Sequence, residues 1–86
     1  MKARKAFEKI YNCEEKYRSK GEKLKEGIMW KLWNQIVDQY SKGPNVYFGD
    51  LEETEVKDLF SKLEQIELEE EALEIYQGAS ILLKLK

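Results

Sequence analysis

Histidine is absent from this 86-residue sequence, and cysteine and proline occur once each. Without an imidazole, the chain lacks the commonest general base, the Ser-His-Asp and Cys-His catalytic groupings, and every zinc pattern that uses histidine. Its five glycines are scattered, so neither of the glycine-rich loops that bind phosphates is present. We therefore expect a protein that is not an enzyme and that holds no cofactor and no metal ion.

The single cysteine rules out a disulfide within the chain. Cys13 also lacks a histidine that would activate its thiol or bind zinc beside it. We interpret Cys13 as a small apolar residue that packs against the protein interior.

Long apolar runs are missing as well. Runs such as 28–30 and 81–83 fall far short of the roughly 18 residues that a membrane-spanning helix needs. The first residues are basic, but Glu8 comes before any apolar core region, which is unlike a secretory signal peptide. The sequence thus predicts a soluble, cytoplasmic protein with no membrane partner.

The chain does contain 42% apolar and 37% charged residues, a composition typical of a globular or bundle-like protein. Two separate cores are excluded, because units below about 40 residues rarely fold without metals or disulfides. We therefore predict one helical domain over 1–86. A chain this short buries only about 60% of its unfolded surface, so a core shared by two copies would add stability.

The spacing of the apolar residues predicts an all-α fold, a small bundle of three or four helices. Phe7, Ile10 and Tyr17 belong to a stripe whose members recur three or four residues apart, as in a helix with one buried face. Helices are expected at 3–19, 21–41, 51–66 and 68–85. The residues predicted for the core are Ile10, Leu32, Ile36, Leu59 and Leu63.

The boundary between the first two helices is open. Ser19 and Glu22 have the spacing of a capping box, which favours a new helix start near Gly21. A single helix over 3–41 is the alternative, since the apolar stripe stays in frame and one helical glycine costs only about 1 kcal/mol. The Gly-Pro pair at 43–44 then predicts the end of the second helix.

Two later segments have a weak extended pattern. Residues 46–48 are expected to form a short irregular or β-like linker. For the tail 80–86 we favour a helix, with a strand paired to 46–48 as the alternative. Between them, Asp50 stands three places before Glu53 and suggests the capped start of a helix.

The second half of the chain also leaves the number of helices open. The apolar stripe changes phase between Ile66 and Leu68, and a two-residue step fits neither helical neighbour spacing. Residues 51–85 are therefore either two helices that turn near Glu67 or one helix whose buried face changes sides.

The segment 28–40, IMWKLWNQIVDQY, carries the main functional signal. At 100° per residue its apolar side chains cover an arc of about 200°, whereas an ordinary surface helix has a stripe nearer 100°. Such a helix needs neighbours on two sides, either within the fold or with another molecule at its flank. Trp33 lies near the middle of the arc and is also a candidate for the interior. The polar side is expected to hold Lys31, Asn34, Gln35, Asp38 and Gln39. We predict that contacts to a partner protein come from Trp30, Trp33, Val37 and Tyr40.

Charge is distributed unevenly along the chain. Residues 1–32 hold ten Lys and Arg against five Glu, a balance of +5, while the remainder holds five Lys against twelve acidic residues, a balance of −7. The acidic residues of the second half are interpreted as a solvated face, since the Glu-x-x-His pairs of dinuclear metal sites are missing. The basic and acidic parts are expected to match within one subunit or between subunits.

Two functions follow from these patterns. The first is a small regulatory, adaptor or inhibitor protein that binds other proteins through the aromatic helix face and is expected to self-associate as a homodimer or to bind a larger protein. The alternative is nucleic-acid binding by the basic N-terminal region, where lysines and arginines alternate with aromatic residues. The residues predicted to contact nucleic acid are Lys2, Arg4, Lys5, Lys9, Lys16 and Arg18.

Overall fold

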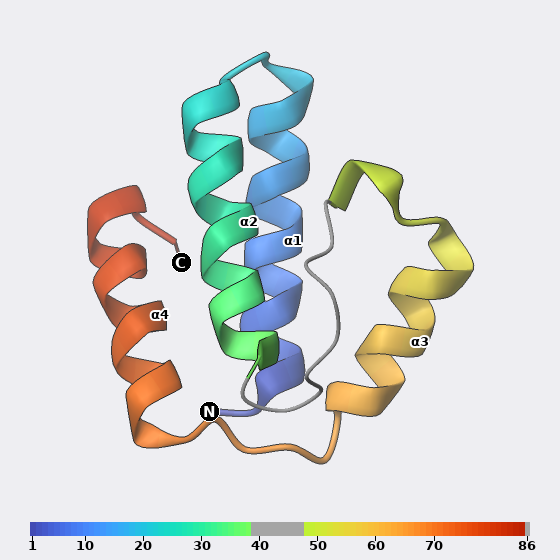
Figure 1. The fold of residues 1–86 in the computed structure, drawn as a ribbon, viewed down its shortest axis with the longest axis vertical. Helices are drawn as coiled ribbons and strands as arrows, with labels where there is room; N and C mark the ends of the chain where they lie inside the picture. The colour runs from blue at the N-terminus through green and yellow to red at the C-terminus, as the bar shows by residue number, and fades with distance from the viewer. Residues whose placement is uncertain (39–47, 86) are drawn as a thin grey trace.

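The computed structural model of the protein describes residues 1–38 and 48–85, apart from the side chains of residues 37, 38 and 48. These residues form four α-helices and one short 3-10 helix, with no strand among them (Figure 1). The predicted all-α bundle is therefore confirmed. The elements are α1 (Ala3–Ser19), α2 (Lys23–Asp38), η1 (Phe48–Asp50), α3 (Glu53–Leu63) and α4 (Glu70–Leu83).

An antiparallel hairpin of α1 and α2 forms the centre of the molecule. In Figure 1, α4 runs beside this hairpin on one side and α3 lies on the other, with α4 in contact with α2 and α3 in contact with α1. The helix α2 is thus covered by two neighbours, as its wide apolar arc predicted. Its polar side was predicted wrongly at Asn34, which is buried and whose Nδ2 donates to the carbonyl of Trp30 at 2.9 Å.

Helix α1 ends in a Schellman motif at Gly21. The backbone N–H of Glu22 donates to the carbonyl of Tyr17 at 2.9 Å, and Gly21 has a φ of +73°, which glycine adopts without the penalty of a Cβ atom. The predicted break is confirmed against a single long helix. The capping box is wrong, because the hydroxyl of Ser19 donates back to the carbonyl of Glu15 at 2.8 Å and so belongs to the end of α1.

A turn over residues 64–69 separates α3 from α4. This turn pairs with the start of the chain through an antiparallel bridge between Lys2 and Glu67, in which the N–H of Ala3 donates to the carbonyl of Ile66 at 2.8 Å. The phase change after Ile66 therefore marks a turn, and the two-helix alternative is confirmed.

The segment before α3 differs from the prediction. Phe48 begins the 3-10 helix η1 instead of ending an extended linker, and residues 46 and 47 lie outside the described residues. Asp50 belongs to η1, while Glu52 takes the N-cap position of α3 and makes no side-chain cap. The predicted Asp50 cap is thus wrong, because the 3-10 turn delays the helix start by two residues.

The C-terminal tail is helical as far as Leu83, which confirms the favoured alternative over a strand. Lys84 then takes a left-handed conformation with a φ of 56°. The N–H of Leu85 donates to the carbonyl of Ser80 at 3.0 Å, and the Leu85 side chain is buried. A left-handed residue therefore turns the chain back onto the core at both the end of α1 and the end of α4.

The core is organised around Phe7, which joins three helices. Its ring centroid lies 4.3 Å from that of Trp33 on α2 and 5.0 Å from that of Phe60 on α3, within the range of favourable aromatic pairs. Cys13 packs against this core, as predicted. Of the residues predicted for the core, Leu59 is half-buried, and the buried ones are Ile10, Leu32, Ile36 and Leu63.

Candidate functional site

Of the aromatic residues predicted to contact a partner, the structure describes Trp30 and Trp33. Trp33 is only 1% exposed and packs on Phe7, so it belongs to the monomer's core. This corrects its assignment as a contact residue, since the middle of the α2 arc faces α1. Trp30 is half-buried. Tyr40 and the side chain of Val37 lie outside the described residues.

The basic residues predicted to contact nucleic acid separate into two groups. Lys2 and Arg4 make ion pairs within the chain, Lys2 with Glu67 at 3.0 Å and Arg4 with Glu64 at 3.2 Å. The guanidinium of Arg4 also lies 5.6 Å from the centre of the Phe60 ring. The expected match between basic and acidic segments therefore exists within one subunit at this end of the molecule.

The remaining basic residues lie further along α1. Lys5, Lys9 and Lys16 fall on one side of the helix at 100° per residue, where Lys5 and Lys16 are exposed and Lys9 is half-buried. Arg18 points elsewhere and binds Glu14 at 3.2 Å. Phe7 is buried, so this aromatic ring is not available to stack on a base.

The outer face of α4 is the surface that the sequence patterns did not single out. We use this name for the residues that lie away from the buried Ala72 and Tyr76, all of which are exposed: Glu70, Glu71, Glu74, Gln77, Gly78, Ile81 and Leu82. Ile81 is 82% exposed and Leu82 is 73% exposed. A helical projection of residues 70–83 places the apolar Ile81 opposite Ala72, which is the signal that could have revealed this face. It was missed because the tail was open to interpretation as either a helix or a strand.

Gly78 lies in the middle of this face. A Cβ atom built on Gly78 would have no neighbour within 4 Å, so packing within the monomer does not require a glycine there. A glycine inside a helix costs roughly 0.5–1 kcal/mol relative to alanine. On the outer face of α4, the helix surface is thus low at Gly78, which has no side chain. Two apolar side chains are exposed one helical turn later.

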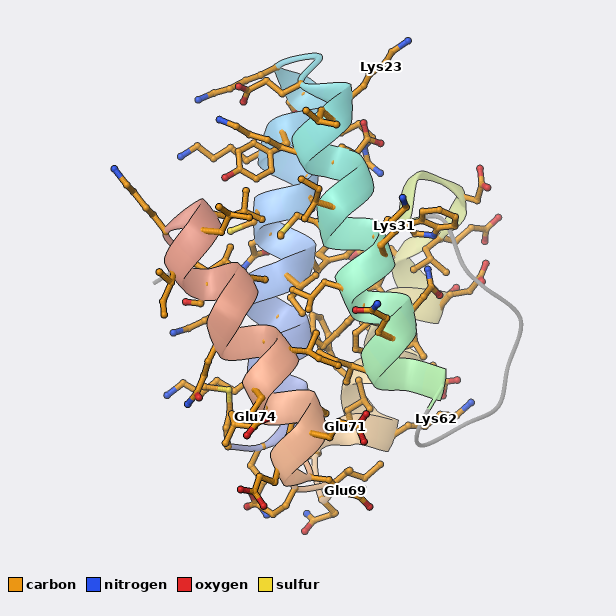
Figure 2. The ribbon with its side chains drawn as sticks, turned by 60° about the vertical axis from the view of Figure 1, so that its left-hand side comes forward. Lys23, Lys31, Lys62, Glu69, Glu71 and Glu74 are labelled. Atoms are coloured by element: carbon orange, nitrogen blue, oxygen red, sulfur yellow. The ribbon has the colours of Figure 1, made fainter. Side chains whose placement is uncertain are left out.

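Acidic residues gather at the start of α4. Figure 2 shows Glu69, Glu71 and Glu74 there, with Lys62 of α3 at the same end of the molecule and Lys23, at the start of α2, at the opposite end. The exposed Lys84 follows the last turn of α4. The outer face of α4 therefore has an acidic first half and an apolar second half that is followed by a lysine.

A buried carboxyl is the second feature that the sequence reasoning missed. Glu14 is 0% exposed and lies on the face of α1 that also carries Phe7 and Ile10. Its position four residues after Ile10 and three before Tyr17 continues the apolar stripe, and this was the available signal. Glu26, on the facing helix α2, is buried too.

The surroundings of Glu14 disfavour its charge. One carboxyl oxygen accepts from Arg18 at 3.2 Å, and the other is buried with no hydrogen-bond partner among the described residues. Burial raises the pKa of Glu14 to about 7; Arg18 opposes this rise, and the neighbouring Glu26 adds to it. In contrast, hydrogen bonds from Lys2 and the N-terminal amine lower the pKa of the exposed Glu67.

The described residues contain no cluster of three or more Cys, Asp or Glu that is arranged to hold a metal ion. Within the same residues, no helix is long and apolar enough to cross a membrane. In comparisons with protein-family models, with curated proteins and with solved structures, none matched this chain. Features of the described residues that bear on function include the outer face of α4 and the buried Glu14.

Proposed function

We propose that this protein is a small non-enzymatic, cytoplasmic regulatory protein that works by association with proteins, and that it first associates with a second copy of itself through the outer face of α4. The observation that carries the proposal is the exposure of Ile81 and Leu82 one turn after the open Gly78. Exposed apolar side chains that form a patch, as opposed to scattered single ones, are characteristic of interaction surfaces.

The face is complementary to itself when two copies run antiparallel. If the two α4 helices cross near Gly78, the first half of α4 in one copy lies against the last turn of α4 in the other. Ile81 would then pack over the shallow surface at Gly78, as a side chain enters a hole between neighbouring helices. Lys84 would approach Glu71 of the second copy, and the two-fold arrangement makes each of these contacts twice.

This arrangement moves the predicted contact from the aromatic face of α2 to α4. The reason is that α1 and α4 already cover the centre of the α2 arc, including Trp33. The proposal keeps the self-association expected from the length of the chain and places its interface on α4.

Sedimentation equilibrium over low to high micromolar concentrations tests the proposal. We expect the wild-type chain to form dimers and the double variant Ile81→Ser/Leu82→Ser to remain monomeric. Leu24→Ser is the matched control, because Leu24 is 81% exposed but lies on α2, and it should dimerise as the wild type does. A monomeric wild type at every concentration, or equal dimerisation of the double variant, would contradict the proposal.

A pair of glycine variants probes the same face without removing apolar surface. Gly78→Ala should weaken dimerisation, because its methyl group occupies the space where two helices approach. Gly27→Ala on α2 is the control, since a Cβ atom there also has no neighbour within 4 Å. Both substitutions should stabilise the monomer slightly, so only an effect on association limited to Gly78 supports the proposed contact.

Nucleic-acid binding remains the alternative, supported by the common side of Lys5, Lys9 and Lys16 on α1. Ion pairs of Lys2 and Arg4 with acidic residues count against it. Binding to single-stranded nucleic acid that weakens steeply between low and moderate salt would favour this alternative.

A further inference from the structure

We propose that the tip of the α1–α2 hairpin binds the surface of an anionic membrane, with Leu24 entering the lipid and the surrounding lysines meeting the headgroups. We use the name hairpin tip for residues 16–25, which comprise the last turn of α1, the connection at Gly21 and the first turn of α2. The proposal does not rest on the association through α4. Binding at the surface needs no membrane-spanning segment, whereas the expectation of no membrane partner came from the lack of one.

The hairpin tip is strongly basic. It holds four lysines and one arginine against one glutamate, a balance of +4, while the whole chain has a net charge of −2. All other residues together therefore carry −6. Glu15, the next acidic residue on α1, points about 100° away from Lys16 around the helix. The tip is thus a positive region on an otherwise acidic molecule, and such a region attracts anionic surfaces.

Most of this positive charge is not used within the fold. Lys25 pairs with Glu22 at 3.4 Å and Arg18 pairs with Glu14 at 3.2 Å. The other basic residues of the tip are exposed and make no ion pair with any described residue: Lys16, Lys20 and Lys23. Figure 2 shows Lys23 extending from this end of the molecule into solvent. These three lysines can therefore approach a negative surface without first breaking an ion pair.

A large apolar side chain stands among the lysines. Leu24 is 81% exposed and lies between Lys23 and Lys25 in the sequence. In Figure 1 the connection between α1 and α2 extends beyond the ends of the other elements. A flat surface can therefore reach Leu24 and the neighbouring lysines together.

A lipid surface meets both requirements of the hairpin tip. Its anionic headgroups attract lysines, and each lysine near the surface strengthens binding about fivefold. The hydrocarbon beneath the headgroups accepts an apolar side chain. Because lysine has a long aliphatic stem, its ammonium group can stay among the headgroups while Leu24 enters more deeply.

Nucleic acid would satisfy only the charge. Base stacking needs an accessible aromatic ring, and the one aromatic residue of the tip, Tyr17, is half-buried. Its hydroxyl donates to the carbonyl of Leu83 at 3.5 Å, and the ammonium of Lys25 lies 5.4 Å from its ring centre. A phosphate backbone also gives Leu24 no apolar contact, so the exposure of Leu24 favours lipid.

Co-sedimentation of the full chain with lipid vesicles tests the proposal. The wild type should bind vesicles of phosphatidylcholine that contain about 30% phosphatidylserine, and should bind pure phosphatidylcholine vesicles at least about tenfold more weakly. Binding to the anionic vesicles should weaken as salt is added, because ions screen the attraction. Absence of binding to the anionic vesicles, or equal binding to both kinds, would overturn the proposal.

Charge variants locate the contact. Lys20→Gln/Lys23→Gln should weaken binding to the anionic vesicles about 25-fold. Lys57→Gln/Lys62→Gln on α3 is the matched control, because it removes the same charge from two exposed lysines, and it should weaken binding by less than about twofold. Equal losses for the two pairs would show that only net charge matters and would contradict a contact at the tip.

Variants of Leu24 separate insertion from charge. Leu24→Ser should weaken binding to the anionic vesicles about tenfold, while Leu24→Met stays apolar and should bind as the wild type does. Since Leu24 is exposed, both variants should keep their helical circular dichroism spectrum. Vesicle binding that Leu24→Ser leaves unchanged would overturn the proposal, because only the attraction that any polyanion, including nucleic acid, exerts on the lysines would remain.

Discussion

At the scale of single residues, burial distinguishes side chains that the sequence pattern treats alike. Trp30 and Trp33 stand three places apart in the same apolar segment, yet Trp33 is enclosed and Trp30 is only half-buried. Helical periodicity locates the middle of an apolar arc, and this predicted that Trp33 was a candidate for the interior. It does not reveal which neighbour covers each flank, because that depends on helices distant in the sequence.

The burial of Trp33 predicts a large loss of stability when its side chain is removed. Trp33→Ala should lower the free energy of unfolding by about 3–5 kcal/mol, because it removes a buried ring that contacts Phe7 and leaves a cavity between helices. Leu24→Ala on the same helix should change it by less than about 0.5 kcal/mol, since Leu24 is exposed. Urea denaturation followed by circular dichroism measures both. Similar losses for the two variants would mean that Trp33 is not part of the core.

At the scale of secondary-structure elements, the chain's helices and the break after the first of them were predictable, while the side-chain caps at the helix starts were not. The spacing of apolar residues predicted four segments, and the four helices lie within them. The capping signals at Ser19 and Asp50 were wrong, since a Schellman turn and a 3-10 helix took their places. Local side-chain motifs compete with backbone turns of similar free energy, so tertiary contacts decide between them.

The two left-handed turns should respond to substitution with opposite signs, because one holds a glycine and the other a lysine. Gly21→Ala should destabilise the protein by about 1 kcal/mol, because a Cβ atom is unfavourable at a φ of +73°. Lys84→Gly should stabilise it by about 0.5–1 kcal/mol, because Lys84 now carries that penalty at a φ of 56°. Thermal unfolding of both variants checks the opposite signs. A loss of stability in Lys84→Gly would show that the Lys84 side chain makes contacts that outweigh the backbone strain.

At the scale of the whole molecule, the arrangement of the helices decides which charges meet. The sequence predicted a basic first third and an acidic remainder, and the fold joins them at one end through Lys2, Arg4, Glu64 and Glu67. The outer face of α4 emerges only when the tail is known to be helical and to pack on one side. The buried Glu14 was readable from its place in the α1 stripe, but its closeness to Glu26 depends on how α1 and α2 fold back on each other.

The stability of the whole molecule should therefore depend on pH in a way that a single substitution removes. The native pKa of Glu14 is about 7, against 4.5 for an ordinary glutamate, so the native state binds more protons than the unfolded state between these values. The stabilising contribution is fully present below pH 4.5 and is lost as the pH rises through 7. At 1.36 kcal/mol per pKa unit, this loss is on the order of 3 kcal/mol.

Glu14→Gln removes this dependence, because the glutamine side chain stays neutral over the whole pH range. The variant and the wild type should have similar free energies of unfolding near pH 5, and the variant should be the more stable by about 3 kcal/mol near pH 8.5. Glu67 acts in the opposite direction, since its pKa is lowered in the native state, and its contribution is lost as the pH falls. Both proteins retain Glu67, so the difference between their free energies of unfolding, measured by urea denaturation at each pH, isolates Glu14. If this difference stays constant from pH 5 to 8.5, Glu14 is not neutral in the native core.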